Sequence, residues 1–183
     1  MNKNKNKNKN IGTVQVYTGD GKGKTTAALG LALRAMGHGG KVIIIQFMKG
    51  DENYGEVRMA RKLEPMGLTL EQHGLPTFVK KGAPSKEDLE LAARGIERAR
   101  QVLDAGEHDL VILDELNVAV DYGVIKLEDA LDLLDRRNRH TELVITGRYA
   151  PPEILDRADY VSRIEEVKHP WRNGLSARPG VEY

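Results

Sequence analysis

The stretch Thr18-Gly-Asp-Gly-Lys-Gly-Lys-Thr-Thr26 decides the fold of this chain. It follows a short apolar run at residues 14–17 and precedes an apolar, helix-forming run at residues 27–33. A strand, a glycine-rich turn and a helix in this order are the layout of a phosphate-binding loop. The glycines allow a tight turn, and the backbone N–H groups of the loop and of the helix N-terminus attract a polyphosphate. We therefore expect a polyphosphate site made by Gly19, Asp20, Gly21, Lys22, Gly23, Lys24, Thr25 and Thr26.

The spacing of this motif departs from the usual one. Three residues, rather than four, separate Gly19 from Gly23-Lys24-Thr25. Either the loop is one residue shorter, or Thr18 replaces the first glycine. In both cases Lys24 is expected to reach phosphate oxygens and Thr25 to offer its hydroxyl to Mg²⁺. The alternative is a glycine-rich hairpin with incidental lysines, which the flanking strand and helix patterns disfavour.

A second motif, Leu-Val-Ile-Leu-Asp114-Glu115, is an apolar strand that ends in two acids. In P-loop proteins an acid at such a strand end faces the phosphate loop and holds the Mg²⁺ shell. Adjacent strand residues point to opposite faces, so one acid can meet the metal while the other supports it or packs. The alternative is a capping or solvated acid pair. Arg148 ends the next apolar strand at the same edge, where it either reaches phosphate or substrate or faces solvent.

Strand-like and helical patterns alternate along the chain. The apolar runs typical of strands lie at 14–17, 41–46, 68–72, 110–113, 143–146 and 160–167. The helical patterns follow Lys24 and lie at 55–65, 86–105 and 127–137, and Pro151-Pro152 opens a short helix. Ser85, with the acid Asp88 three residues later, is a capping signal for the helix at 86–105. One face of that helix is expected to be apolar, with Leu89, Ala92, Ala93, Ile96, Ala99, Val102 and Leu103. The alternation of strands and helices implies right-handed crossovers. The predicted fold is α/β, a P-loop NTPase-like (RecA-like) and mainly parallel β-sheet with helices on both faces.

Composition bounds the class of protein. The chain has 183 residues, which fit a single domain at 11–183 after an Asn/Lys tail at 1–10 that we expect to be disordered. Without the four lysines of this tail, acidic residues outnumber basic ones by three, so nucleic-acid binding is not expected. There is no cysteine to act as a nucleophile or metal ligand. No apolar run is long enough to span a membrane, and a cytoplasmic protein is expected.

The motifs together resemble those of the P-loop ATP:corrinoid adenosyltransferases, also called cob(I)alamin adenosyltransferases. The resemblance covers residues 14–183, and the shorter phosphate loop is that family's normal form. It rests on Gly-Asp-Gly-Lys-Gly-Lys-Thr-Thr26 after a Val-Gln-Val-Tyr strand, Gln46-Phe-Met-Lys-Gly50, Leu113-Asp-Glu-Leu-Asn117, Val144-Ile-Thr-Gly-Arg148 and Pro179-Gly-Val-Glu-Tyr183.

The resemblance implies an activity and a set of site residues. The family transfers the 5′-deoxyadenosyl group of ATP to Co(I) of a reduced corrinoid and releases triphosphate, in adenosylcobalamin biosynthesis or salvage. Residues 19–26 match its ATP-binding loop, and Thr25 and Glu115 match its Mg²⁺-linked positions, where Mn²⁺ is an alternative. Phe78 matches an aromatic near the lower corrin face, whereas Pro76 stands near the position of a second aromatic. A homodimer and a flavin-dependent reductase as electron donor are further expectations from the family.

Two other functions remain open from the residues alone. One is a P-loop kinase for a small molecule, with Arg136, Arg137 and Arg139 on a mobile lid. The other is a RecA-like ATPase that acts as a switch or a nucleic-acid motor, with Glu115 orienting water. The products distinguish them, because both alternatives form ADP whereas adenosyl transfer forms triphosphate.

Overall fold

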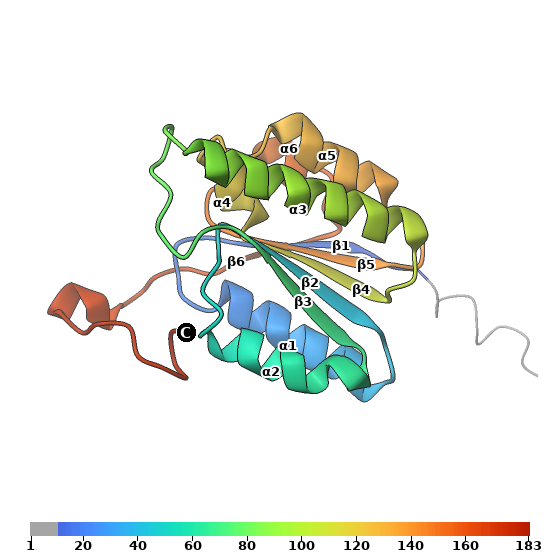
Figure 1. Ribbon diagram of the computed structural model, residues 1–183, viewed down its shortest axis with the longest axis horizontal. Coiled ribbons are helices and arrows are strands. Elements are labelled where there is room, and N and C mark those ends of the chain that lie inside the picture. Colours follow the sequence, from blue (N-terminus) through green and yellow to red (C-terminus); the bar gives the residue numbers. More distant parts are fainter. Residues whose placement is uncertain (1–10) are drawn as a thin grey trace, which may run out of the picture.

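The computed structural model describes residues 11–183, so the Asn/Lys run at 1–10 lies outside the described residues. Six strands form one sheet in the order β3-β2-β4-β5-β1-β6 (Figure 1). All neighbouring strands are parallel, which confirms the predicted α/β fold. The strands are β1 (Val14–Thr18), β2 (Val42–Phe47), β3 (Leu68–His73), β4 (Leu110–Asp114), β5 (Glu142–Thr146) and β6 (Tyr160–Arg163).

Helices cover both faces of the sheet, as predicted (Figure 1). One face carries α1 (Lys24–Gly37) and α2 (Gly55–Leu63), with the short 3-10 helix η1 (Glu64–Met66) after α2. The other face carries α3 (Lys86–Ala105), α4 (Leu116–Asp121), α5 (Leu127–Arg136) and α6 (Pro152–Leu155). A second 3-10 helix, η2 (Pro170–Asn173), lies in the segment after β6. That segment runs outward and then returns to the body of the protein. The centroid of the Tyr183 ring lies 6.1 Å from the centroid of the Tyr54 ring, at the start of α2.

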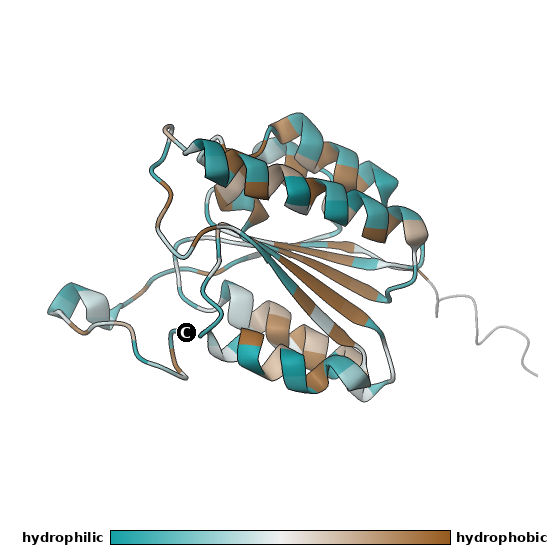
Figure 2. Cartoon of the chain, viewed as in Figure 1, coloured by the Kyte–Doolittle hydropathy of each residue, from teal (hydrophilic) through white to brown (hydrophobic). Residues whose placement is uncertain are grey.

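The central strands are apolar because both of their faces are covered. Every residue of β2 and of β4 is buried, which explains their nearly continuous runs of branched apolar residues. One apolar cluster fills the space under α1 and α2, and another fills the space under α3, α4 and α5. Figure 2 shows the hydrophobic strands between two layers of helices, of which α2, α3 and α5 carry both hydrophilic and hydrophobic residues.

The capping signal of α3 is confirmed. The Ser85 hydroxyl accepts a hydrogen bond from the Asp88 N–H at 3.1 Å, and the Asp88 carboxylate accepts one from the Ser85 N–H at 2.8 Å. The apolar face expected on this helix is only partly buried, because Leu89 and Ala93 are exposed. These two side chains border a hollow of about 220 Å³ between α3 and the start of α5 instead of facing the sheet.

In the α-helices and strands, three differences from the sequence prediction are larger than one residue, and they concern α2, α4 and β6. The helix α2 ends at Leu63 because Pro65 follows, and the chain tightens into η1. The short helix α4 was not expected, since six residues carry little periodicity. The last strand ends at Arg163 rather than at residue 167. Beyond it the Ile164 carbonyl accepts a hydrogen bond from Gly21 N–H at 2.8 Å, so the chain lies against the phosphate loop.

Candidate active site

The predicted phosphate loop connects β1 to α1 at the carboxyl edge of the sheet. Thr18 is the last residue of β1, so the turn begins at Gly19 and the loop is the shorter form. Gly19 has a φ of 99° and Gly23 a φ of 121°, a region that favours glycine. At Gly21 the requirement is space, because a Cβ there would lie 2.6 Å from the Glu165 carbonyl oxygen. The glycines are thus needed by the backbone, as the motif predicts.

Lys24 is the first residue of α1, and its side chain folds back into the loop. Its Nζ donates hydrogen bonds to the carbonyl oxygens of Gly19 and Gly21, both at 2.7 Å. Burial lowers the pKa of this ammonium group. The charge therefore lies inside the loop, where a polyphosphate would replace the two carbonyls as its partner. The side chains of Asp20, Lys22 and Thr26 are exposed around it.

Asp114 ends β4, and its fully buried carboxylate accepts four hydrogen bonds. Oδ2 lies 2.7 Å from Lys49 Nζ and 3.0 Å from Gln46 Nε2. Oδ1 accepts hydrogen bonds from the hydroxyls of Thr146 at 2.7 Å and Thr25 at 2.9 Å. Burial alone would raise the pKa of this carboxyl, but the Lys49 charge and the hydrogen bonds hold the pKa below its usual value. With its oxygens so occupied, Asp114 is suited to orient Thr25 rather than to bind a metal directly.

Glu115 differs from Asp114 in backbone conformation, burial, hydrogen bonding and the direction of its pKa shift. Its backbone is left-handed, with a φ of 62°, and its N–H donates to Thr146 Oγ1 at 3.0 Å. Within residues 11–183 its half-buried carboxylate has no hydrogen-bonding partner. Burial raises the pKa of this carboxyl, and the charge of Asp114 raises it further. Glu115 is therefore the acid of the pair that is free to meet a cation.

Backbone strain marks the same edge of the sheet. Met48, Glu115 and Tyr149 are the non-glycine residues with positive φ among residues 11–183, at 57°, 62° and 60°. They follow β2, β4 and β5, whose carboxyl ends surround Asp114. Non-glycine residues rarely adopt this conformation, and such strain concentrates at functional sites. Lys49 and Arg148, which contact Asp114 and the phosphate loop, are direct neighbours of Met48 and Tyr149.

Lys49 was not among the residues predicted for the site. It follows the left-handed Met48 after β2, and its Nζ also lies 3.4 Å from Thr25 Oγ1. Burial tends to lower the pKa of this amine, but Asp114 and Glu115 raise it above its usual value. The signal that could have found it is its position at the carboxyl end of a buried strand. Gln46 and Thr146 share that signal.

Arg148 and Phe78 have different surroundings. The exposed Arg148 donates from Nη2 to the Asp20 carbonyl oxygen at 3.0 Å, so it reaches the rim of the phosphate loop. Phe78 lies in the connection between β3 and α3, and its ring is fully exposed. A side chain that anchors a loop on the core would be buried, so Phe78 does not have that role. Its exposed ring is available to a ligand.

The arginines considered for a kinase lid lie at the opposite edge of the sheet. Arg137 Nη1 donates to the carbonyl oxygens of Gly12 at 2.8 Å and Thr141 at 3.0 Å, next to the starts of β1 and β5. Arg136 pairs with Asp132, one turn earlier on α5, and with Asp104 on α3. Because the phosphate loop follows the end of β1, these side chains cannot close over it. The lid interpretation is therefore wrong.

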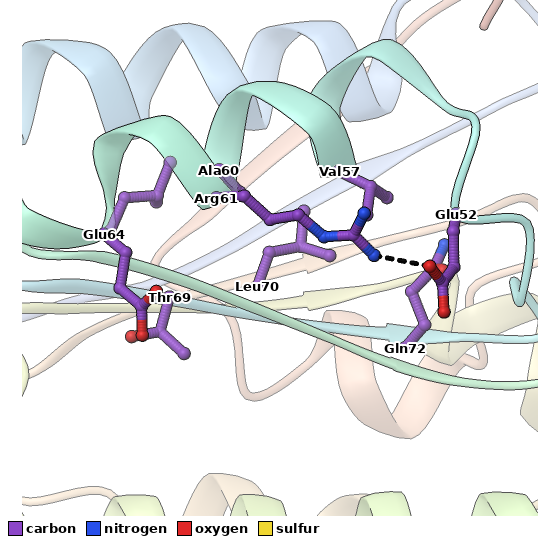
Figure 3. Close-up of a pocket in the computed structure, with 9 residues that line it drawn as sticks. Glu52, Val57, Ala60, Arg61, Glu64, Thr69, Leu70 and Gln72 are labelled. Carbon is purple, nitrogen blue, oxygen red and sulfur yellow. Dashed lines mark hydrogen bonds and ion pairs between the residues drawn. The ribbon is translucent and has the colours of Figure 1, made fainter.

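A hollow of about 290 Å³ lies away from this site, between α2 and β3 (Figure 3). Its lining includes Val57, Leu70 and Gln72, and Arg61 and Glu52 form an ion pair at its mouth with 2.7 Å between Nη2 and Oε2. None of its lining residues belongs to the phosphate loop. Residues 11–183 contain no group of three or more His, Cys, Asp or Glu side chains placed to hold a metal ion. No helix in the same range is long and apolar enough to cross a bilayer.

Comparison with known proteins identifies similar sequences. Residues 10–183 match the family model described as ATP:corrinoid adenosyltransferase BtuR/CobO/CobP. The chain is 38% identical over 160 residues to a corrinoid adenosyltransferase of Escherichia coli K12, covering 87% of this chain and 79% of that protein. Over 159 residues it is 38% identical to the Salmonella typhimurium corrinoid adenosyltransferase CobA, with the same coverage. A Pseudomonas aeruginosa corrinoid adenosyltransferase is 35% identical over 160 residues, covering 87% and 77%.

Proposed function

Because the chain belongs to the ATP:corrinoid adenosyltransferase family, we propose that its phosphate loop, residues 19–26, holds the triphosphate of ATP during adenosyl transfer. The enzyme adenosylates corrinoids, in keeping with a role in cobalamin biosynthesis. Co(I) of the reduced corrinoid attacks the ribose C5′ and forms a Co–C bond. The C5′–O bond breaks, and its electron pair leaves with triphosphate. The protein therefore needs no nucleophile of its own.

The observation that carries the proposal is the arrangement around Lys24. Its ammonium lies inside the loop, held by two carbonyl oxygens at 2.7 Å. A triphosphate in the loop meets this charge together with the backbone N–H groups at the start of α1. These groups stabilise the negative charge that grows on the leaving group as the C5′–O bond breaks. Arg148, at the rim, adds a further positive charge.

The residues present fit a Mg²⁺ ion bound with the triphosphate. The Thr25 hydroxyl donates to Asp114 at 2.9 Å. Lys49 Nζ donates to the same hydroxyl oxygen at 3.4 Å, so one lone pair is left for a cation. The Glu115 carboxylate has no other partner within residues 11–183. Oxygen ligands of this kind suit Mg²⁺ or Mn²⁺. We propose that Thr25 and Glu115 hold the ion and that Asp114 orients Thr25, while the ion neutralises phosphate charge.

The corrinoid is assigned to the carboxyl edge next to the loop. Phe78 offers a fully exposed ring, and we propose that this ring lies near the lower face of the macrocycle, as the family resemblance implies. We further propose a single functional domain at 11–183, a homodimer, a cytoplasmic location where ATP is available, and a flavin-dependent reductase as the source of electrons for Co(I). Neither the kinase nor the ATPase alternative gains support from the comparisons.

Product analysis tests the proposal directly. The protein is incubated without oxygen with ATP, Mg²⁺ and chemically reduced cobalamin, and the released phosphate chain is identified. We expect triphosphate in equal amount to a light-sensitive adenosylated corrinoid. Omission of Mg²⁺ should abolish both products. Formation of ADP that does not depend on the corrinoid would overturn the assignment.

A further inference from the structure

The connection between β3 and α3, residues 74–85, carries Phe78 and contacts the body of the protein through the partly buried Val79, which packs against the apolar core, and through Lys81. Lys81 Nζ lies 2.6 Å from Asp121 Oδ2, at the end of α4. The same ammonium lies 5.1 Å from the centroid of the Tyr149 ring and 5.8 Å from that of Tyr122. Both distances are in the range of cation–π attraction. Next to it, Gly82 N–H donates to the Tyr122 carbonyl oxygen at 3.2 Å.

The partners of Lys81 belong to elements that begin or end at the active site. Asp121 and Tyr122 close α4, whose first turn is preceded by Glu115. Tyr149 follows Arg148, which donates to the phosphate loop at 3.0 Å. One ammonium group thus joins the Phe78 connection to the end of the helix that follows β4 and to the residue next to Arg148. These are three separate segments that meet at the carboxyl edge.

The strength of this contact depends on its combination of partners. A single exposed ion pair is worth little, because water and salt screen it. Lys81 is itself 57% exposed, but it pairs with a carboxylate that is only 23% exposed and lies beside two aromatic rings. Tyr149 adopts a left-handed φ of 60°, a conformation that persists only where surrounding contacts hold it. The geometry therefore favours a fixed attachment over a chance surface contact.

We propose that Lys81 is a positioning residue for the corrinoid. It holds the 74–85 connection in the position in which Phe78 meets the macrocycle. The proposal rests on the proposed function, in which Phe78 faces the corrinoid. Lys81 itself does not touch the reacting atoms. Its loss leaves the phosphate loop and its charges in place. The connection then samples other positions, and only a fraction of molecules presents Phe78 correctly.

The test separates the two substrates. Lys81→Met should raise KM for reduced cobalamin by about 3- to 10-fold, the size expected for one ion pair and one cation–π contact. KM for ATP should change by less than about 2-fold, because the loop is untouched. Lys81→Arg, which keeps the charge, should restore most of the affinity. Lys86→Met is the matched control, since Lys86 is 92% exposed and pairs only along α3 with Glu90.

Substitution of Asp121, the partner of Lys81, tests the same contact. Asp121→Asn should reproduce the corrinoid effect of Lys81→Met, and the exchange Lys81→Asp with Asp121→Lys should recover part of it. Hydrogen exchange measured without substrates should be faster over residues 74–85 in both single variants and unchanged in Lys86→Met. This readout does not depend on activity.

Each outcome decides a different question. If wild-type protein forms no adenosylated corrinoid, the proposed function fails. If wild-type protein is active but KM for cobalamin in Lys81→Met and Asp121→Asn equals that of Lys86→Met, only the positioning role is overturned. Equal increases in KM for ATP and for cobalamin would also overturn it, because they would indicate general damage to the site.

Discussion

The Nζ atom of Lys49 lies 2.7 Å from Oδ2 of Asp114, and the Asp114 side chain is completely buried. Removal of a carboxylate from water is costly unless a cation and hydrogen-bond donors replace the solvent. Lys49 supplies that charge from the end of the neighbouring strand β2. The opposite oxygen of Asp114 then holds the Thr25 hydroxyl at 2.9 Å. The ion pair thus fixes the geometry of the proposed metal and phosphate site.

Loss of the cation alone should be strongly destabilising. We expect Lys49→Met to lower the free energy of unfolding by about 3–5 kcal/mol, because Asp114 is left as a buried, uncompensated charge. The measurement is urea unfolding followed by circular dichroism at pH 7. The double variant Lys49→Met/Asp114→Asn should recover much of the loss, since the buried charge is gone. A change below about 1 kcal/mol in the single variant would refute this account of the pair.

The charge inside the phosphate loop should matter for catalysis more than for folding. We expect Lys24→Ala to reduce adenosyl transfer by about 100-fold or more, the scale of losing one group that stabilises charge in the transition state. Its circular dichroism spectrum should match that of wild type. Lys62→Ala, at an exposed position of α2, is the control and should keep normal turnover. Near-normal turnover in Lys24→Ala would remove the loop from the proposed mechanism.

The parts of the site that could be predicted are those encoded by local patterns. The phosphate loop, the apolar strand before Asp114 and the capping box of α3 each depend on neighbours in the sequence, so spacing reveals them. Lys49, Gln46 and Thr146 lie near the carboxyl ends of apolar strands, which makes them candidates, but their shared contact with Asp114 could not be found in this way. They approach Asp114 only because β2, β4 and β5 lie side by side in the sheet, and that order is a property of the whole fold. The same distant residues decide that Asp114, and not the adjacent Glu115, accepts hydrogen bonds from several donors.

Glycine-to-alanine substitutions can show where the absence of a Cβ is required, in the phosphate loop or in the helix α1 that follows it. Gly21→Ala would place a methyl group 2.6 Å from the Glu165 carbonyl oxygen, a backbone atom that cannot rotate away. We expect a loss of about 1–3 kcal/mol in the free energy of unfolding, as for an overpacked site, together with a higher KM for ATP.

Gly30→Ala is the matched control for this substitution. Gly30 lies in α1, and an added Cβ would meet no atom within 4 Å. Alanine is the better helix former, so this variant should be more stable by about 1 kcal/mol with unchanged kinetics. Thermal unfolding of both variants gives the comparison. Equal stability of the two would contradict the close packing of the loop against the segment after β6.

A pH effect on stability should arise from His73, the last residue of β3. Burial lowers the pKa of this imidazole in the folded protein. The neighbouring Glu71 lies 3.6 Å from its Nε2 but shares its charge with Arg98, at 2.9 Å, so it offsets burial only in part. The unfolded chain therefore binds the proton first. The contribution of neutral His73 to the free energy of unfolding should be fully present above the unfolded pKa of 6.5. It should be lost as the pH falls through the lower pKa of the folded protein.

The comparison with a variant isolates this contribution from that of the carboxylates. Between pH 7.5 and 5.5, wild type should lose more unfolding free energy than His73→Gln, by at most about 1.4 kcal/mol per pH unit for one proton. His108, whose pKa burial also lowers, stays as a second contributor, so His73→Gln/His108→Gln should show a still flatter profile. The measurement is urea unfolding at several pH values under constant ionic strength. Parallel profiles for wild type and His73→Gln would mean that burial of this imidazole does not disfavour its charged form, because a lowered folded pKa must steepen the loss.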